Sequence, residues 1–149
     1  MSVIRITKEF KFEMAHALWG YDGPCKNIHG HSYYLYVTIS GKPLNDPSSP
    51  KNGMVIDYSV IKKIVKENIT NSLDHALLLN ANTPHKELEK FKNMFDNIVL
   101  VPFQPTCENL LSDFASRIQK LLPKEIKLFS LRLSETVTSF AEWYADDNK

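Results

Sequence analysis

The chain has 149 residues, which predicts a single domain over residues 1–149 with a sizeable hydrophobic core. Its 18 lysine and arginine residues nearly balance its 17 aspartate and glutamate residues, so it lacks the basic character that nucleic-acid binding requires. Because no apolar run reaches the roughly 20 residues that span a bilayer and the first residues do not form a signal peptide, we expect a cytoplasmic protein without a membrane partner.

The first two predicted elements are β-strands that carry histidines. Apolar and polar residues alternate over residues 3–17, and His16 falls on the apolar face of this strand. Glycine, proline and asparagine residues that favour turns then place Cys25 on a loop. Alternation resumes at residue 29, so His29 and His31 are predicted to lie side by side at the start of the apolar face of a second strand.

The rest of the chain contains both helical and strand patterns. Apolar residues at helical spacing predict helices at residues 57–70, at a shorter segment that holds Leu88, Phe91 and Phe95, and at residues 106–122, where Thr106 is the N-cap. Strands are predicted at residues 54–58, 97–103, 126–136 and 139–145, and a loop at residues 73–84. In the strand at 126–136 one face is formed by Phe129, Leu131, Leu133 and Glu135. We therefore expect an α+β fold with a largely antiparallel sheet, helices on one face, and open edges that oligomerisation could cover.

The three histidines of the first two strands indicate a metal site. Side chains two residues apart on one strand face are roughly 7 Å apart, so two imidazoles can lean toward one ion. His16 supplies a third nitrogen if the two strands pair near these ends. A single histidine on an apolar face is more often a core residue, but three neutral imidazoles suit Zn²⁺ and leave a fourth position for water or substrate.

Cys25 leaves three interpretations open. As a fourth ligand it would complete a structural zinc site of one cysteine and three histidines. As a free thiol beside the metal it would be a general base or nucleophile, because a nearby cation favours the thiolate. It could also be an inert thiol. A disulfide with Cys107, the other cysteine, is not expected in a reducing compartment.

Several acidic residues and histidines carry further candidate chemistry. Asp74 and His75 resemble an acid-oriented histidine, but adjacent residues do not face each other on a helix or strand, so a working pair requires irregular backbone. The alternative is a capping aspartate beside an incidental histidine. Glu135 on its apolar face could bind a guanidine-like edge of a heterocycle, or it is a solvated residue at a strand end. Glu108 complements a helix dipole, and His85 is predicted at the surface.

Five motifs in chain order resemble those of the 6-pyruvoyltetrahydropterin synthase and 6-carboxytetrahydropterin synthase family. They are F-x-x-A-H at residues 12–16, C-x₃-H-G-H at 25–31, L-D-H at 73–75, P-T-x-E-N at 105–109 and E-T at 135–136. None is specific alone, but five in this order are, and they cover nearly the whole chain. The resemblance implies the tunnelling fold (T-fold), in which subunits join edge to edge into a β-barrel and two rings stack into a homohexamer with sites between subunits.

The resemblance also implies a role for each matching residue. The implied ligands of a zinc ion are His16, His29 and His31. The implied catalytic residues are Cys25, Asp74 and His75. The implied pterin-binding residues are Glu135, whose carboxylate anchors the pterin, and Thr106 and Glu108, which fall in the segment that lines the pterin pocket.

The implied substrate is 7,8-dihydroneopterin triphosphate. The short C-x₃-H-G-H spacing is similar to that of bacterial 6-carboxytetrahydropterin synthases of the queuosine pathway, which implies a zinc-dependent carbon–carbon lyase that forms 6-carboxy-5,6,7,8-tetrahydropterin, acetaldehyde and triphosphate. One alternative is a pyruvoyl-forming synthase with the same residue roles, and another is a non-catalytic pterin-binding protein that uses zinc only for folding. The chain departs from the family pattern at Met14, where a small residue is customary, and in a longer segment at 81–103.

Overall fold

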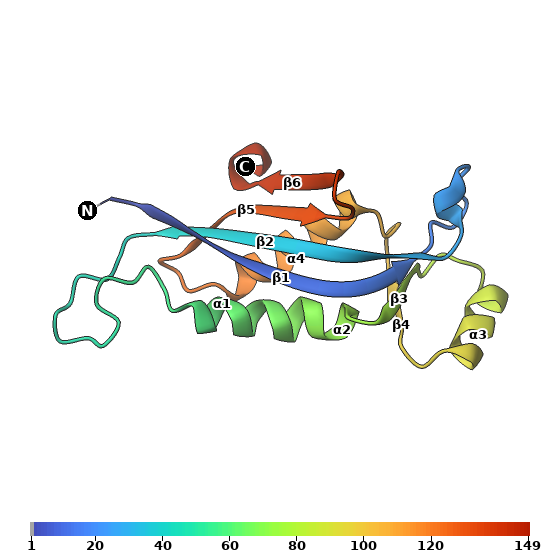
Figure 1. Ribbon diagram of the computed structural model, residues 1–149, viewed down its shortest axis with the longest axis horizontal. Coiled ribbons are helices and arrows are strands. Elements are labelled where there is room, and N and C mark those ends of the chain that lie inside the picture. The colour runs from blue at the N-terminus through green and yellow to red at the C-terminus, as the bar shows by residue number, and fades with distance from the viewer. Residues whose placement is uncertain (1) are drawn as a thin grey trace.

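A six-stranded sheet organises residues 2–149, the part of the chain that the computed structural model describes (Figure 1). The strands are β1 (Ile4–His16), β2 (His29–Gly41), β3 (Ala76–Asn80), β4 (Ile98–Val101), β5 (Lys127–Ser134) and β6 (Phe140–Tyr144). The α-helices are α1 (Tyr58–Val65), α2 (Asn71–Leu73), α3 (His85–Met94) and α4 (Cys107–Leu121). The order across the sheet is β4-β3-β1-β2-β5-β6, and α1 and α4 cover one face of it.

The long hairpin of β1 and β2 fixes the position of the histidines. Its strands pair antiparallel without interruption, from Ile4 opposite Gly41 to His16 opposite His29. The predicted alternation is confirmed, because alternate side chains along both strands are buried beneath the helices. Since side chains of one parity share a face, all three histidines lie on the helix-covered side, at the end of the hairpin where the 17–28 loop joins the strands.

Two helices cover this face, and both were predicted. The Asp57 side chain caps α1, and the helix continues through a π-helical turn (Lys66–Thr70) into α2. Thr106 caps α4 by accepting a hydrogen bond of 3.2 Å from the backbone N–H of Asn109, and α4 ends before Pro123. Within residues 2–149, no helix is both long and apolar enough to cross a membrane.

Two of the predicted segments are wrong. Residues 54–58 form no strand, because Val55 and Ile56 pack against the core from irregular backbone and their apolar character reflects this burial. The predicted loop at 73–84 contains β3, which lies between β1 and β4 and is parallel to both. Its first four residues are all buried, and a strand covered on both faces shows no alternation. The sheet is therefore mixed, with parallel pairs on one side of β1 and antiparallel pairs on the other.

The longer segment at 81–103 forms the predicted short helix, α3, and the predicted strand, β4. The helix ends at Met94, so Phe95, which was expected within it, lies just outside. Leu88 of α3 packs with Leu77 and Leu79 of β3 in a second, smaller hydrophobic cluster. This segment therefore covers the face of β3 that is turned away from the main core, which explains why β3 is apolar throughout.

Phe129 does not share a face with Leu131 and Leu133, contrary to the sequence-based expectation. The register between β2 and β5 shifts beside Thr38, and Phe129 is left without a partner in the ladder. This bulge turns the Phe129 ring out of the core, where the Arg5 guanidinium lies 3.7 Å from its centroid. A one-residue irregularity of this kind leaves no mark in the apolar pattern.

Substitution of Phe114 by Ala should lower the free energy of unfolding by about 3–5 kcal/mol, because this fully buried ring of α4 would leave a cavity against the sheet. Leu121→Ala is the matched control on the same helix, since Leu121 is 46% exposed, and it should change stability by only about 0.5 kcal/mol. Urea unfolding followed by circular dichroism measures both. Equal losses in the two variants would contradict the placement of Phe114 in the core.

Candidate functional site

His16, His29 and His31 form one cluster at the end of the β1–β2 hairpin. His16 is the last residue of β1 and lies opposite His29, while His31 lies opposite Met14. One ring nitrogen from each histidine lies within 4.8 Å of those of the other two. The predicted convergence of the three side chains is confirmed, and the cluster has the geometry of a set of ligands that could hold a metal ion.

Backbone carbonyls fix the orientation of two of these rings. The Nδ1 atom of His16 lies 2.8 Å from the Pro105 carbonyl oxygen, and that of His29 lies 2.8 Å from the Asn27 carbonyl oxygen. Because a carbonyl oxygen can only accept, each Nδ1 carries a hydrogen, and the neutral rings then present a bare Nε2. The two Nε2 atoms face each other at 3.0 Å. Two lone pairs at this distance repel unless a cation or a shared proton lies between them.

Burial opposes the shared proton. A proton between the two Nε2 atoms would make the pair cationic, yet His16 is only 2% exposed and its burial lowers its pKa. Burial also lowers the pKa of His31, whose Nε2 is buried and has no hydrogen-bond partner in the chain. One ring nitrogen from each histidine therefore points into one space, where burial disfavours the cationic forms of His16 and His31. The donor set fits a divalent metal ion.

Glu135 lies beside the same cluster. It follows β5 directly, and its Oε1 lies 3.5 Å from the Nε2 atoms of both His16 and His31. The Tyr33 hydroxyl donates a hydrogen bond of 3.3 Å to this oxygen, and burial raises the pKa of Tyr33, so the phenol keeps its proton. The sequence placed Glu135 at the end of an apolar face but gave no sign that it meets the histidines. Its negative charge favours a cation at this position.

Asp74 and His75 form the pair that the sequence suggested. Asp74 Oδ2 lies 3.1 Å from His75 Nδ1, and His75 has a backbone φ of 59°, the only positive φ of a non-glycine residue within residues 2–149. Glu13 holds this conformation, since its backbone N–H donates to Asp74 Oδ1 at 2.8 Å and its carbonyl accepts from the His75 N–H at 2.6 Å. The irregular backbone that a working pair requires is therefore present.

A shallow pocket of about 290 Å³ lies beside His75, next to the end of the β1–β2 hairpin. It is lined by His31 and His75 together with Glu13, Met14, Ala15, Gly30 and Ser32. The hydrogen bond from the Glu13 N–H lowers the pKa of Asp74, so its carboxylate is ionised and can orient the imidazole of His75. The side chain of His75 is 77% exposed, which leaves its other ring nitrogen accessible.

Cys25 stands apart from the cluster. It lies in a short 3₁₀ turn (Pro24–Lys26) of the 17–28 loop, is half-buried, and is not one of the side chains whose donor atoms converge. Within residues 2–149 the cluster thus consists of three histidines, as expected for an open site and not for a closed four-ligand site. Cys107 is buried in α4, and both cysteines are free, as expected.

The remaining predicted residues surround the cluster at a distance or lie on the surface. Thr106 caps α4 directly after Pro105, the residue whose carbonyl orients His16. Glu108 is exposed in the first turn of α4, and His85 is exposed on α3, as predicted. The roles of the Pro105 and Asn27 carbonyls were not predictable from the sequence, because backbone groups orient side chains without any residue-specific signal.

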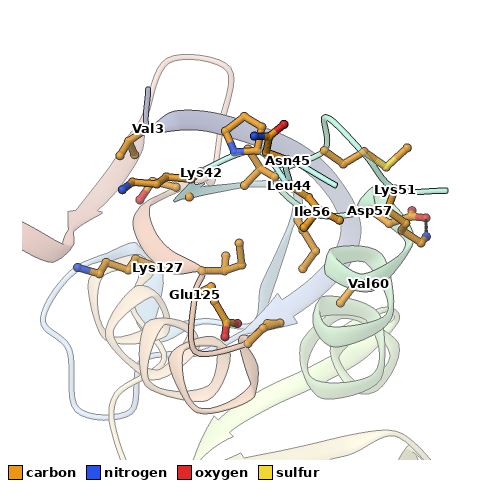
Figure 2. Close-up of a pocket in the computed structure, with 17 residues that line it drawn as sticks. Val3, Lys42, Leu44, Asn45, Lys51, Ile56, Asp57, Val60, Glu125 and Lys127 are labelled. Carbon is orange, nitrogen blue, oxygen red and sulfur yellow. Dashed lines mark hydrogen bonds and ion pairs between the residues drawn. The ribbon is translucent and has the colours of Figure 1, made fainter. Parts of the chain in front are cut away.

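A larger cavity than the pocket beside His75 lies away from the candidate site. It has a volume of about 890 Å³ and lies at the opposite end of the β1–β2 hairpin, between the polar connection after β2 and the start of β5 (Figure 2). Lys42 and Lys127 lie on one side of it and the ion pair of Lys51 with Asp57 on the other. None of its lining residues is a predicted site residue, so chemistry and not cavity size locates the candidate site.

Solved structures share this fold. An uncharacterized protein from Wolinella succinogenes has a TM-score of 0.80 at 20% identity, over 97% of this chain and 99% of its own. The 6-pyruvoyl tetrahydropterin synthase of Caenorhabditis elegans has a TM-score of 0.68 at 23% identity, over 97% of both chains. The mixed sheet, the helices on one face and the histidine cluster define a T-fold protein with a site that could hold a metal ion.

Sequence relatives narrow this class to one family. Residues 5–146 match the 6-pyruvoyl tetrahydropterin synthase family. The 6-carboxy-5,6,7,8-tetrahydropterin synthase of Haemophilus influenzae is 38% identical over 143 residues, which cover 95% of this chain and 99% of the relative. The protein of the same name from Aquifex aeolicus is 29% identical over 161 residues, which cover 93% and 96% of the two chains. The chain belongs to the 6-pyruvoyl tetrahydropterin synthase family, as its five motifs predicted.

Replacement of His31 by Ala should lower the affinity for the metal by more than about 100-fold. The loss of a residue that only hydrogen-bonds to a metal ligand already lowers metal affinity by about 10–100-fold, and His31 would be a ligand itself. His85→Ala is the control, since His85 is an exposed histidine outside the cluster. Dialysis against zinc followed by elemental analysis should give one ion per chain for the control. Equal metal content in both variants would contradict the assignment of the cluster as a metal site.

Proposed function

We propose that the protein is a zinc-dependent carbon–carbon lyase that converts 7,8-dihydroneopterin triphosphate and one water molecule to 6-carboxy-5,6,7,8-tetrahydropterin, acetaldehyde and triphosphate, in cytoplasmic queuosine biosynthesis. The observation that carries this proposal is the convergence of three imidazole nitrogens beside the Glu135 carboxylate. The 38% identity to a relative named for the carboxy product supports this product over the pyruvoyl one.

Zinc suits the donor set because its catalytic sites use three protein ligands and keep one position open. His16, His29 and His31 would hold the ion, and the Pro105 and Asn27 carbonyls would keep two of the rings aimed at it. When bound there, zinc supplies a Lewis acid that acidifies the C–H bonds next to the side-chain hydroxyls of the substrate.

Cys25 and His75 would move the protons. The Cys25 thiol would act as the base at the substrate side chain, since the cluster leaves it free of metal coordination. His75 would be the partner acid or base. The ionised Asp74 accepts from Nδ1 of His75 and so leaves Nε2 to exchange a proton with the substrate. The 77% exposure of the His75 side chain leaves this nitrogen open to a substrate.

Glu135 would bind the pterin. Its carboxylate can accept two parallel hydrogen bonds from the 2-amino-pyrimidinone edge, and the Tyr33 hydroxyl holds one of its oxygens in place. Thr106 and Glu108 would line the pterin pocket from the first turn of α4. The substrate's ring would then lie between Glu135 and the start of α4, with its side chain toward the histidines.

We also propose that the site is completed in a homohexamer. The sheet has two open edges, β4 and β6, which edge-to-edge pairing of subunits into a barrel would cover. In the single chain the pocket beside His75 is shallow and the His75 side chain is 77% exposed. A neighbouring subunit would enclose the substrate there and separate it from bulk water.

Replacement of Cys25 by Ala should lower turnover by at least about 100-fold, the smallest effect typical of a lost general base. The zinc content should stay near one ion per chain, because Cys25 lies outside the ligand cluster. Elemental analysis and a turnover assay on the same preparation measure both quantities. Loss of zinc together with activity would favour a structural site with four ligands instead.

Incubation of the purified protein with 7,8-dihydroneopterin triphosphate should give the carboxy product and one acetaldehyde per turnover, as measured by mass spectrometry. A pyruvoyl product without acetaldehyde would favour a 6-pyruvoyltetrahydropterin synthase, the activity in the name of the C. elegans structural relative.

Removal of the metal with a chelator should abolish turnover while the chain stays folded. Unfolding on chelation, with no turnover beforehand, would favour a zinc-stabilised pterin-binding protein.

A further inference from the structure

The loop that carries Cys25, residues 17–28, has little apolar contact to hold it in place. None of its side chains is buried, and Trp19, Tyr21 and Ile28 are 51%, 46% and 47% exposed. Inside the loop, the Leu18 N–H donates a hydrogen bond of 3.0 Å to the Cys25 carbonyl, so the two arms of the loop are joined at this point. A segment with so few buried contacts depends on hydrogen bonds for its position.

Gln104 provides the hydrogen bond that ties this loop to a distant segment. Its Nε2 donates to the Trp19 carbonyl at 2.9 Å. Among the side-chain hydrogen bonds made by residues 2–149, no other links the 17–28 loop to a segment outside the β1–β2 hairpin. Trp19 follows Leu18 in the chain, so this contact reaches Cys25 through one further hydrogen bond.

The partners of Gln104 fix the orientation of its amide. The Trp19 carbonyl can only accept, so Nε2 must face it, and Oε1 accepts from Asn80 Nδ2 at 3.3 Å. Asn80 is fixed in turn, because its Oδ1 accepts from the Asn82 backbone N–H at 2.9 Å. The two amides therefore form a directed chain that runs from the end of β3 to the loop, with a backbone group at each end.

The same segment also orients a histidine of the cluster. The Gln104 carbonyl accepts from Asn109 Nδ2 at 3.0 Å, which ties it to the first turn of α4. The next residue, Pro105, is buried, and its carbonyl orients His16. Two adjacent residues thus hold, on one side, the loop with Cys25 and, on the other, a ring of the metal-competent cluster.

We propose that Gln104 is a positioning residue, which holds the 17–28 loop so that Cys25 keeps a fixed place relative to His16 and the other cluster histidines. The consequence for catalysis rests on the proposed function, in which Cys25 moves a proton. The Gln104 side chain hydrogen-bonds to Trp19 and Asn80 and not to Cys25 or the described cluster residues, so its effect passes through the backbone of Trp19 and Leu18.

Two substitutions separate the hydrogen bond from the charge. Gln104→Glu keeps an acceptor for Asn80 but sets an oxygen against the Trp19 carbonyl, and Gln104→Met keeps the shape without either hydrogen bond. Gln119→Glu is the matched control, because Gln119 is the only other glutamine and is exposed on α4.

The first measurement is the rate at which iodoacetamide alkylates Cys25 in the substrate-free protein. Cys107 should not react with iodoacetamide, since it is buried and burial raises its pKa to about 12.

Both Gln104 variants should raise the alkylation rate of Cys25 by about tenfold, the shift in loop equilibrium that the loss of one hydrogen bond produces. The control should react at the wild-type rate, and zinc content should be unchanged in all three. In the turnover assay the Gln104 variants should lower kcat by about ten- to a hundredfold and leave KM nearly constant, as expected when a reacting group is misplaced.

Wild-type alkylation rates in both Gln104 variants would overturn the inference. An effect confined to Gln104→Glu would also overturn it, because charge and not the hydrogen bond would then be responsible. Loss of zinc in either variant would assign Gln104 to the support of the metal site instead. Because alkylation needs no substrate, this arm decides the inference even if the wild-type protein fails to convert dihydroneopterin triphosphate, which would count against the proposed function alone.

Discussion

Two imidazole nitrogens that face each other at 3.0 Å, both without a hydrogen, are the constraint on which the candidate site depends. The pairing of β1 with β2 creates this encounter, because it sets His16 directly opposite His29. A shift of the register by one residue would turn the histidines of one strand to the other face. The buried alternate residues along both strands prevent such a shift, so the hydrophobic core determines the geometry of the polar site.

The Asp74–His75 pair depends on the same strands in a different way. A non-glycine residue with φ near +59° is held only where its surroundings determine its backbone, and here the backbone of Glu13 supplies one donor and one acceptor to the two residues. Glu13 belongs to β1 and lies three residues before His16. The strand that carries His16 therefore also sets the backbone conformation of His75.

Features with a local cause were predictable from the sequence, and features with a distant cause were not. Period-two and helical patterns located β1, β2, α1 and α4, and the parity of the strands brought the three histidines together. β3 was missed because α3 and the core cover both of its faces, and the bulge at Phe129 because it changes pairing without changing composition. Glu135, which follows β5, reaches the cluster from more than a hundred residues away in the chain, and no local pattern encodes that meeting.

Backbone carbonyls, not carboxylates, orient His16 and His29. Every residue has a backbone carbonyl, so a substitution at position 27 keeps the acceptor that orients His29. A substitution at position 105 keeps the acceptor for His16 as long as the local backbone is unchanged. The orientation of these two imidazoles therefore does not depend on which side chains occupy the neighbouring positions. Related chains can therefore keep such a histidine cluster while the residues around it vary.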